Sequence, residues 1–380
     1  MIKKNSFLFI NLLLFILFIK GNKIVAQDVV FKATAPKGVV KNEQFRLTYT
    51  LNKEGKDIRL PSNIEGFDIL FGPSVSSSYS TQIINGKSTS QSSFSYTYIL
   101  VAPKEGTFTI DPASITVNGS NYKSNSLQIN VLPPDKESDG NAQSNQDSSS
   151  SSTEIKERDA FIRTVVSKNR IYEQEGFMVT FKLYTTLNVV DFGRIEFPEF
   201  EGFMVEELDT PSNQQLQLEH YEGRNYYTAT LRKTLLFPQR SGKITIPSGR
   251  LEMVFSVPSG KRVSSFFGMQ EVNVDVKKPM HTNPVTLDVN PLPSSGRPIS
   301  FKGAVGAFTF KPTISTEEIK ANEPITLKLE ISGTGNQKLI PNPDVEFPSN
   351  FEVYDPTIDN QLTASSNGLQ GTRTIEYLAI

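Results

Sequence analysis

Hydrophobic and polar residues alternate strictly in three segments of the chain, 42–51, 174–183 and 322–331. Each segment opens with an amide residue followed by glutamate, and every second residue after that pair is apolar. The apolar positions are Phe45, Leu47, Tyr49 and Leu51, then Phe177, Val179, Phe181 and Leu183, then Ile325, Leu327, Leu329 and Ile331. A period of two places one face of a β-strand in a core and the other in water. The same strand is therefore predicted three times.

The motifs that follow each alternating strand also recur in a fixed order. They are a proline-bearing stretch with an aromatic strand (60–70, 197–205, 347–354), a Pro/Gly turn with a hairpin strand (103–110, 238–246), and a closing strand that ends at Pro133 or Pro291. Short strands with turns throughout, and no long helical periodicity, predict an all-β chain of tandem Ig-like β-sandwich modules. A small barrel is the main alternative.

The repeats predict three modules, since 380 residues exceed what one core usually supports. The first is expected at 27–132, and the second at 159–290. An insertion near 263–282, where valines alternate, is expected to add an edge hairpin to the second module. The third, at 303–380, stops before its Pro/Gly turn and closing strands, so it is expected to be truncated. The natural protein is accordingly expected to continue beyond Ile380, or this chain to be a fragment.

Three further segments lie outside the modules. Residues 1–26 begin with two lysines and carry an apolar run at 7–19 that is too short for a ~30 Å hydrocarbon core, which predicts a cleaved signal peptide. Residues 133–158 are rich in Ser, Asp and Asn and are predicted to form a flexible linker. Residues 291–302 contain three prolines and are predicted to form a stiffer, Pro-rich linker.

Composition excludes several functions. The net charge of −1 provides no basic field for nucleic acid or anionic lipid. Cysteine is absent, which excludes disulfides, a thiolate nucleophile, Cys-ligated metals and a lipidated cysteine. Modules of about 100 residues can nevertheless fold on apolar burial alone.

Residues suited to catalysis are scarce. The two histidines, His220 and His281, lie in no recognisable motif, and no nucleophile elbow or Gly-rich phosphate loop occurs. Acidic residues cluster in one stretch, but without the tight spacing and turn glycine of a Ca²⁺ loop, so a solvated face is favoured. The cluster comprises Glu196, Glu199, Glu201, Glu206, Glu207 and Asp209. We therefore predict no enzyme and no catalytic, cofactor-binding or metal-binding residue.

Other features suggest structure or surface contact. Glu43, Glu175 and Glu323 recur at one repeat position, which indicates a turn or edge role. The polar tract 74–95, with Asn85-Gly86 at its centre, is typical of a long hairpin with a type I′ turn, either merely exposed or a projecting adhesive loop. A core role is favoured over an exposed apolar patch for Met253, Phe255, Phe266, Phe267 and Met269.

The order of these motifs resembles the BatD family, the aerotolerance or oxygen-tolerance proteins of Bacteroidetes and other bacteria. The resemblance rests on the "NEQF" strand start and on the "APKEGTFTI" and "FPQRSGKITIPS" hairpins, and it extends from about Asp28 to Ile380. It implies an exported, periplasmic protein associated with the inner membrane through a C-terminal helix, and partners with von Willebrand A-type and TPR domains. The sequence ends before any such helix, and the resemblance supplies no catalytic residues.

The function expected from these features is that of an exported non-catalytic scaffold acting through protein–protein contacts in the cell envelope. The alternative is a surface carbohydrate-binding or adhesive protein, although the absence of Trp removes the best stacking platform. A hydrolase without recognisable motifs is the least favoured interpretation. No nucleic acid and no cofactor is expected as a ligand.

Overall fold

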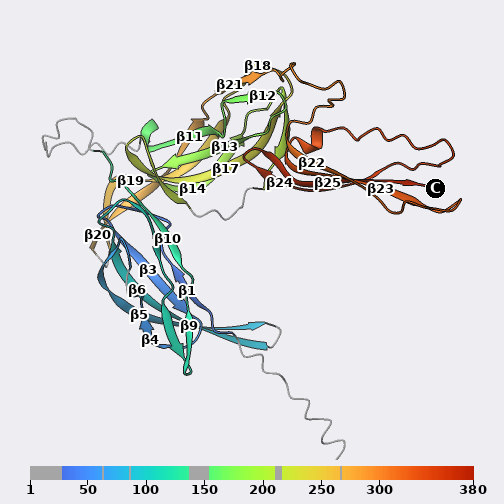
Figure 1. Cartoon of the computed structure of the whole chain (residues 1–380). Helices are drawn as coiled ribbons and strands as arrows, with labels where there is room; N and C mark the ends of the chain where they lie inside the picture. The colour runs from blue at the N-terminus through green and yellow to red at the C-terminus, as the bar shows by residue number, and fades with distance from the viewer. Residues whose placement is uncertain (1–27, 62–63, 85–86, 137–153, 210–215, 266–267) are drawn as a thin grey trace, which may run out of the picture. The chain divides into compact units, whose positions relative to one another are not determined.

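The computed structural model is all-β, which confirms the predicted fold class (Figure 1). It describes residues 28–61, 64–84, 87–136, 154–209, 216–265 and 268–380. In these ranges the only helical elements are the 3₁₀ turns η1 (Glu157–Asp159) and η2 (Gln337–Leu339). No helix in the described ranges is long and apolar enough to cross a membrane.

Several sequence predictions lie outside the described residues. They are the signal peptide at 1–26, the middle of the flexible linker at 137–153, the Asn85-Gly86 turn, and Phe266 and Phe267. The described residues divide into two compact units, one ending at Pro133 and the other extending from Pro134 to Ile380.

The first unit contains the first repeat. Its sheets are β1 (Phe31–Thr34), β3 (Gln44–Leu51), β6 (Lys87–Val101) and β5 (Asp68–Ile84) in that order; β2 (Gly38–Val40), β10 (Leu127–Leu132) and β7 (Gly106–Ile110); and β4 (Lys56–Arg59), β8 (Ser114–Val117) and β9 (Ser120–Lys123). The alternating residues of β3 point into one core, where Leu47, Tyr49 and Leu51 are fully buried. Burial of each such side chain contributes roughly 1.5–3 kcal/mol, so these residues fix the register of β3.

The second repeat has the same plan. Its sheets are β11 (Ala160–Val166), β13 (Phe177–Thr185), β17 (Arg224–Pro238) and β15 (Phe203–Glu207), with β16 (Gln217–Tyr221) also on β17; β12 (Arg170–Tyr172), β21 (Val285–Asn290) and β18 (Gly242–Ile246); and β14 (Asn188–Glu196), β19 (Arg250–Ser265) and β20 (Gly268–His281). The strands β19 and β20 form one long hairpin, and β20 lies at the edge of its sheet. This hairpin starts well before the predicted insertion at 263–282.

The third repeat has one described sheet, ordered β22 (Gly306–Ile314), β23 (Ile325–Gly335), β25 (Gly368–Ala379) and β24 (Thr357–Ser365). Its apolar face is covered in part by the loop that follows β23, through residues such as Ile340, Val345 and Phe347. The side chain of Arg373 anchors that loop, because its Nη1 donates to the carbonyls of Gln337 (2.9 Å) and Ile340 (2.5 Å). Burial among these uncharged acceptors lowers the pKa of the Arg373 guanidinium.

One turn recurs before each alternating strand. Its third residue has a left-handed backbone, with φ of 64° at Asn42, 61° at Gln174 and 67° at Asn322. The next residue, a glutamate in every repeat, donates its backbone N–H to the residue three positions earlier, at 3.0–3.1 Å. Asparagine tolerates this conformation better than most residues. Gln174 in the second repeat is therefore an exception that needs another explanation.

Asparagine side chains cover the outer edge of the first strand in two repeats. Asn125 accepts from the N–H of Ala33 at 2.9 Å and donates to its carbonyl at 3.2 Å. Asn283 accepts from the N–H of Thr164 at 2.7 Å. Both asparagines lie two residues before the closing strand, so each amide replaces part of a missing neighbouring strand.

The ends of the predicted flexible linker at 133–158 are hydrogen-bonded to the second repeat. Asp135 accepts from the backbone and side-chain amides of Asn225 at 2.7 and 2.8 Å. At the other end, the ammonium of Lys278 donates to the carbonyls of Ile155 and Lys156.

Candidate contact site between the second and third repeats

The structure does not bring together the residues that were considered as catalytic or metal-binding candidates. His220 lies in the β16–β17 hairpin with its Nδ1 3.0 Å from the side-chain oxygen of Asn225. His281 lies at the end of β20, opposite Arg250. Among the described residues, no group of three or more His, Cys, Asp or Glu side chains could hold a metal ion.

The acidic stretch of the second repeat forms separate ion pairs. Glu196 pairs with Arg194, and Glu207 pairs with Arg232 on the neighbouring strand. Glu206 instead pairs with Lys338 of the third repeat at 2.6 Å. These three carboxylates therefore pair with three different cationic side chains.

The recurring glutamates stabilise turns. One carboxylate oxygen of Glu175 accepts from the backbone N–H of Tyr172 at 2.9 Å, and the other accepts from Lys168 at 2.7 Å. Glu323 accepts in the same way from the N–H of Lys320 at 2.9 Å. The turn role predicted from their recurrence is confirmed for these two residues.

The residues for which a core role was weighed against an exposed patch differ in burial where the structure describes them. Met253 and Phe255 are fully buried in a cluster of the second repeat. Met269 near the hairpin tip is 65% exposed. A single exposed methionine does not make an apolar patch.

An apolar cluster joins the second repeat to the third. Met178, Leu235 and Phe237 project from the outer face of the β13–β17 sheet and are buried against Leu369 at the start of β25. Met204, Leu208, Leu339, Leu362 and Ala364 pack around this cluster. The junction is thus built like a small core.

Two glycines allow the junction to close. A Cβ atom added to Gly176 would lie 2.6 Å from the Cα of Gly368 and 2.9 Å from a ring carbon of Phe237. The backbone of Gly176 lies outside the left-handed region, so space rather than conformation requires glycine there. Polar contacts flank this approach, from Asn336 Nδ2 to Gln174 Oε1 at 3.1 Å and from Ser167 Oγ to the carbonyl of Ser366 at 3.3 Å.

The second repeat departs from the other two at three positions that touch the third repeat. Gln174 replaces the asparagine of the other two turns and reaches Asn336. Gly176 occupies the position that Gln44 and Pro324 have in the other repeats. Met178 occupies the position of Arg46 and Thr326, which are polar residues of the outer face. These differences are the sequence signal that could have predicted the junction.

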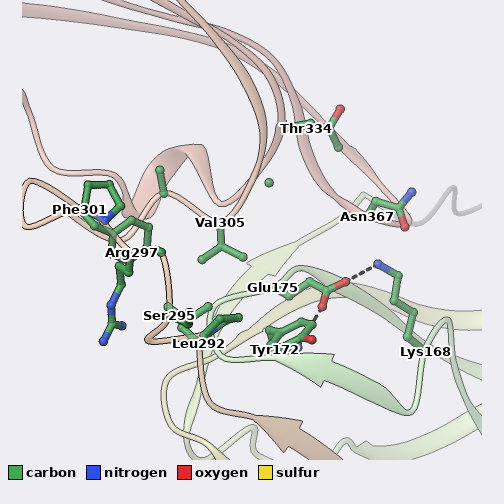
Figure 2. Close-up of a pocket in the computed structure, with 16 residues that line it drawn as sticks. Lys168, Tyr172, Glu175, Leu292, Ser295, Arg297, Phe301, Val305, Thr334 and Asn367 are labelled. Atoms are coloured by element: carbon green, nitrogen blue, oxygen red, sulfur yellow. Dashed lines mark hydrogen bonds and ion pairs between the residues drawn. The ribbon is translucent and has the colours of Figure 1, made fainter.

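A pocket of about 840 Å³ lies beside this junction (Figure 2). Its lining comes from three places: Lys168, Tyr172 and Glu175 around β12; Leu292, Pro293, Ser295, Gly296, Arg297, Pro298 and Phe301 in the connection; and Ala304, Val305, Gly306, Ala307, Thr334 and Asn367 in the third repeat. The predicted Pro-rich linker at 291–302 therefore forms one wall.

The pocket combines an apolar lining with charges at opposite ends. Figure 2 places Arg297 and Phe301 at one end, Val305 in the middle, and the Lys168–Glu175 ion pair at the other end. The guanidinium of Arg297 lies 5.9 Å from the centre of the Phe301 ring. Arg297 has no ion pair with any residue of the described ranges, whereas Glu175 and Lys168 neutralise each other. A mainly apolar pocket at a domain junction, with a few polar groups, is suited to binding.

Comparison with known proteins finds a family model that matches part of the chain. A family model described as the BatD DUF11-like domain matches residues 32–131 and 312–380. These segments cover most of the first repeat and of the third, and residues 132–311 lie outside them. No curated protein matches the chain significantly. The resemblance that the motifs predicted is confirmed.

Proposed function

We propose that this chain, which is similar to the BatD family over residues 32–131 and 312–380, is an exported, non-catalytic scaffold that acts through protein–protein contacts in the cell envelope. The proposal includes a periplasmic location in association with the inner membrane. Its partners are envelope proteins with von Willebrand A-type or TPR domains, as the family resemblance implies.

The packed junction between the second and third repeats is the observation that supports this proposal. Met178, Leu235 and Phe237 bury an outer sheet face, whereas the comparable residues of the first repeat are the exposed Arg46 and the half-buried Ile99 and Val101. Interfaces inside one chain keep two modules in a fixed arrangement when they are apolar and well packed. A fixed arrangement presents a composite surface, including the pocket, that neither repeat has alone.

Co-purification tests the proposal. The tagged full-length chain, recovered from native membranes under mild detergent, is expected to carry envelope proteins with von Willebrand A-type or TPR domains. Tyr172→Ser alters a 45%-exposed pocket residue, and Tyr79→Ser alters a 73%-exposed residue of the first repeat as a matched control. Loss of the partner only with Tyr172→Ser would locate the contact at the pocket.

A second result would contradict the scaffold role. Recovery of no envelope protein, together with specific binding to a glycan array, would instead favour the surface carbohydrate-binding or adhesive alternative. Both measurements use the same purified protein, so they can be compared directly.

A further inference from the structure

The polar tract predicted to be a long hairpin forms β5 and β6 of the first repeat, and its outer part consists of these two strands alone in the described structure. β3 pairs with β6 only from Phe94 to Val101, whereas β5 pairs with β6 from Lys87 onward. Figure 1 shows the light-blue end of this hairpin projecting from the sandwich of the first repeat. A two-stranded hairpin is marginally stable in water, and further strands stabilise it.

The two edges of this sheet differ. Its strand order is β1-β3-β6-β5, so β1 and β5 are the edges among the described residues. Asn125 covers the edge at β1 through its hydrogen bonds to the backbone of Ala33. The closing strand of this repeat, β10, is described and lies in another sheet. The open edge at β5 is therefore not the place of a missing closing strand.

The corresponding edge strands of the other repeats carry charges. β15 contains Glu206 and Glu207, and β24 contains Asp359. From Ser74 to Ile84, by contrast, β5 reads Ser-Val-Ser-Ser-Ser-Tyr-Ser-Thr-Gln-Ile-Ile, with no charged residue. Charged side chains on an edge strand oppose its pairing with another chain. This stretch of β5 lacks that protection.

The hydrogen-bond pattern shows which backbone groups of β5 point outward. The N–H of Asn52 donates to the carbonyl of Val30 at 3.3 Å, so even-numbered residues of β3 bond β1 and odd-numbered residues bond β6. Odd-numbered residues of β3 lie opposite even-numbered residues of β6, which leaves the odd-numbered residues of β6 to bond β5. These lie opposite the even-numbered residues of β5 from Ser74 to Ser80. The odd-numbered residues between them therefore direct their N–H and C=O groups away from β6.

Two of these outward-bonding residues also carry exposed apolar side chains. Val75 is 59% exposed and Tyr79 is 73% exposed. Val75 lies opposite Tyr96, so both side chains lie on the side of the sheet that faces the core of the repeat. The ring of Tyr79 contacts that of Phe94, with 5.9 Å between the ring centres.

We propose that two copies of this chain associate edge to edge through β5, antiparallel and about a twofold axis at Ser77. In this register Ser77 pairs with Ser77 of the second copy, and Val75 pairs with Tyr79 of the second copy on either side of the axis. Pairs of an aromatic and a β-branched residue stabilise neighbouring strands. The segment is thus complementary to itself, and the absence of charge places no like charges opposite each other.

The same features limit the assembly to a dimer. A twofold axis uses the same edge of both copies, so the interface is closed once it forms. The other edge of the sheet is covered by Asn125, which prevents continued growth through β1. The two outer hairpins together form a four-stranded ribbon. This inference is independent of the partners proposed above, because it concerns a surface of the first repeat.

Cysteine cross-linking tests the register. The chain has no cysteine, so one introduced thiol reports one position. Opposed residues of paired antiparallel strands have Cα atoms about 5.5 Å apart, within reach of a disulfide. Ser77→Cys should form a covalent dimer under mild oxidation. Ser80→Cys is the matched control at another exposed serine of the strand, because its two copies are separated by the length from Ser74 to Ser80, about 20 Å. Equal cross-linking of both variants, or none, would overturn the proposal.

Charges at the axis test the symmetry. Ser77→Lys and Ser77→Glu each place two like charges opposite each other, so each variant alone should be monomeric at concentrations where the wild-type chain is dimeric. An equimolar mixture of the two should regain the dimer, because opposite charges then meet. Analytical ultracentrifugation of the full-length chains measures all three samples. A monomeric wild-type chain, or a mixture that stays monomeric, would contradict the twofold axis.

A pair of variants tests the backbone pairing itself. Ser77→Pro removes an outward-pointing N–H without removing a bond to β6, whereas Ser77→Ala keeps the N–H. The twofold axis doubles the loss to two hydrogen bonds, so Ser77→Pro should dimerise roughly tenfold or more weakly than Ser77→Ala. Equal dissociation constants would show that the copies do not pair through the backbone of β5.

One variant separates this proposal from the scaffold function. Tyr79→Ser should weaken the dimer while the envelope partner is still recovered, because that partner contact is placed at the pocket. A wild-type chain that dimerises through Ser77 but recovers no envelope protein would remove the scaffold role alone. A wild-type chain that stays monomeric, and whose Ser77→Pro variant loses the envelope partner, would assign β5 to a strand of that partner and overturn the dimer.

Discussion

Phe237 in the second repeat and Val101 in the first occupy the same place in the recurring sheet, but only Phe237 is fully buried. In the first repeat, Val101 lies opposite Asp68, the first residue of β5. In the second repeat, Phe237 lies opposite Met204, the second residue of β15. On the adjacent strand, exposed Arg46 corresponds to buried Met178. At these positions the outer face is therefore partly exposed in the first repeat and buried in the second.

The difference teaches that inner and outer positions have separate tasks. Inner positions such as Leu47 and Val179 are apolar in both repeats because they build the sandwich core. Outer positions are free to vary, and a few substitutions there convert a solvated sheet into a docking face. The predictions below test this distinction, beginning with the largest expected effect.

Truncation of Phe237 should weaken the junction most. Phe237→Ala removes a fully buried ring and is expected to lower the free energy of unfolding by about 3–5 kcal/mol. Val101→Ala, at the half-buried equivalent position, should lower it by about 1 kcal/mol or less. Urea denaturation of each full-length variant measures both values. Equal losses would show that Phe237 has no special role at the junction.

An added methyl group should also open the junction. Gly176→Ala introduces a Cβ that would lie 2.6 Å from the Cα of Gly368, and overpacking of this kind destabilises by about 1–3 kcal/mol. The exposed equivalent in the first repeat serves as the control, since Gln44→Ala should change stability by about 0.5 kcal/mol or less. Limited proteolysis should show faster cleavage within the third repeat of Gly176→Ala only. Cleavage of Gly176→Ala at the wild-type rate would mean that the junction does not require the close contact between Gly176 and Gly368.

Removal of an edge-covering asparagine should have an intermediate effect in either repeat. Asn283→Ala leaves the N–H of Thr164 without its 2.7 Å acceptor, which should destabilise by about 1–2 kcal/mol. Asn125→Ala should act similarly on the N–H of Ala33. Asn283→Asp retains the acceptor oxygen and provides the matched control. Faster hydrogen exchange of the Thr164 amide in Asn283→Ala, but not in Asn283→Asp, is the expected measurement.

The smallest effect is expected at Tyr49, whose counterpart in the second repeat is Phe181. The Tyr49 hydroxyl is buried without a hydrogen-bond partner in the described structure, so Tyr49→Phe should stabilise by about 1 kcal/mol or leave stability unchanged. Tyr79→Phe, at an exposed position, is the control for loss of a hydroxyl. A clear destabilisation by Tyr49→Phe would reveal a partner for the hydroxyl.

Tyr49→Phe should also reduce the pH dependence of the free energy of unfolding above pH 10. Burial, with a smaller contribution from Tyr98, raises the pKa of Tyr49 from 10.0 to about 12. The unfolded chain therefore loses this proton first, so the contribution of Tyr49 to stability is present below pH 10 and is lost between pH 10 and about 12. Thermal unfolding across this range should show a shallower decline in Tyr49→Phe. An unchanged slope would contradict the assignment.

The strands and the inner core were predictable because the signal is local. Alternation in 42–51 and 174–183 directly reports burial of one face. The recurrence of Glu175 and Glu323 likewise predicted a turn role. Each carboxylate accepts a hydrogen bond from the backbone N–H of the first residue of its own turn. These inferences needed only a few consecutive residues.

The junction and the pocket were not predicted, because their parts are distant in sequence. Period two assigned Met178 to the outer face correctly, but what covers it is a hairpin at 362–369, far along the chain. Gly176 and Gln174 depart from the other repeats, yet neither departure identifies Gly368 or Asn336 as the partner. The pocket combines 168–175 with 292–307 and two later residues, and no local motif reports such a combination.

The apolar outer face of the second repeat has a consequence for the timing of synthesis. A ribosome completes Phe237 more than about a hundred residues before it reaches Leu369, a delay on the order of ten seconds at typical elongation rates. During that interval the side chains of Met178 and Phe237 are exposed to solvent on the nascent chain. Newly made protein accordingly has a brief period in which a chaperone competes with self-association for the surface that the β24–β25 hairpin later occupies.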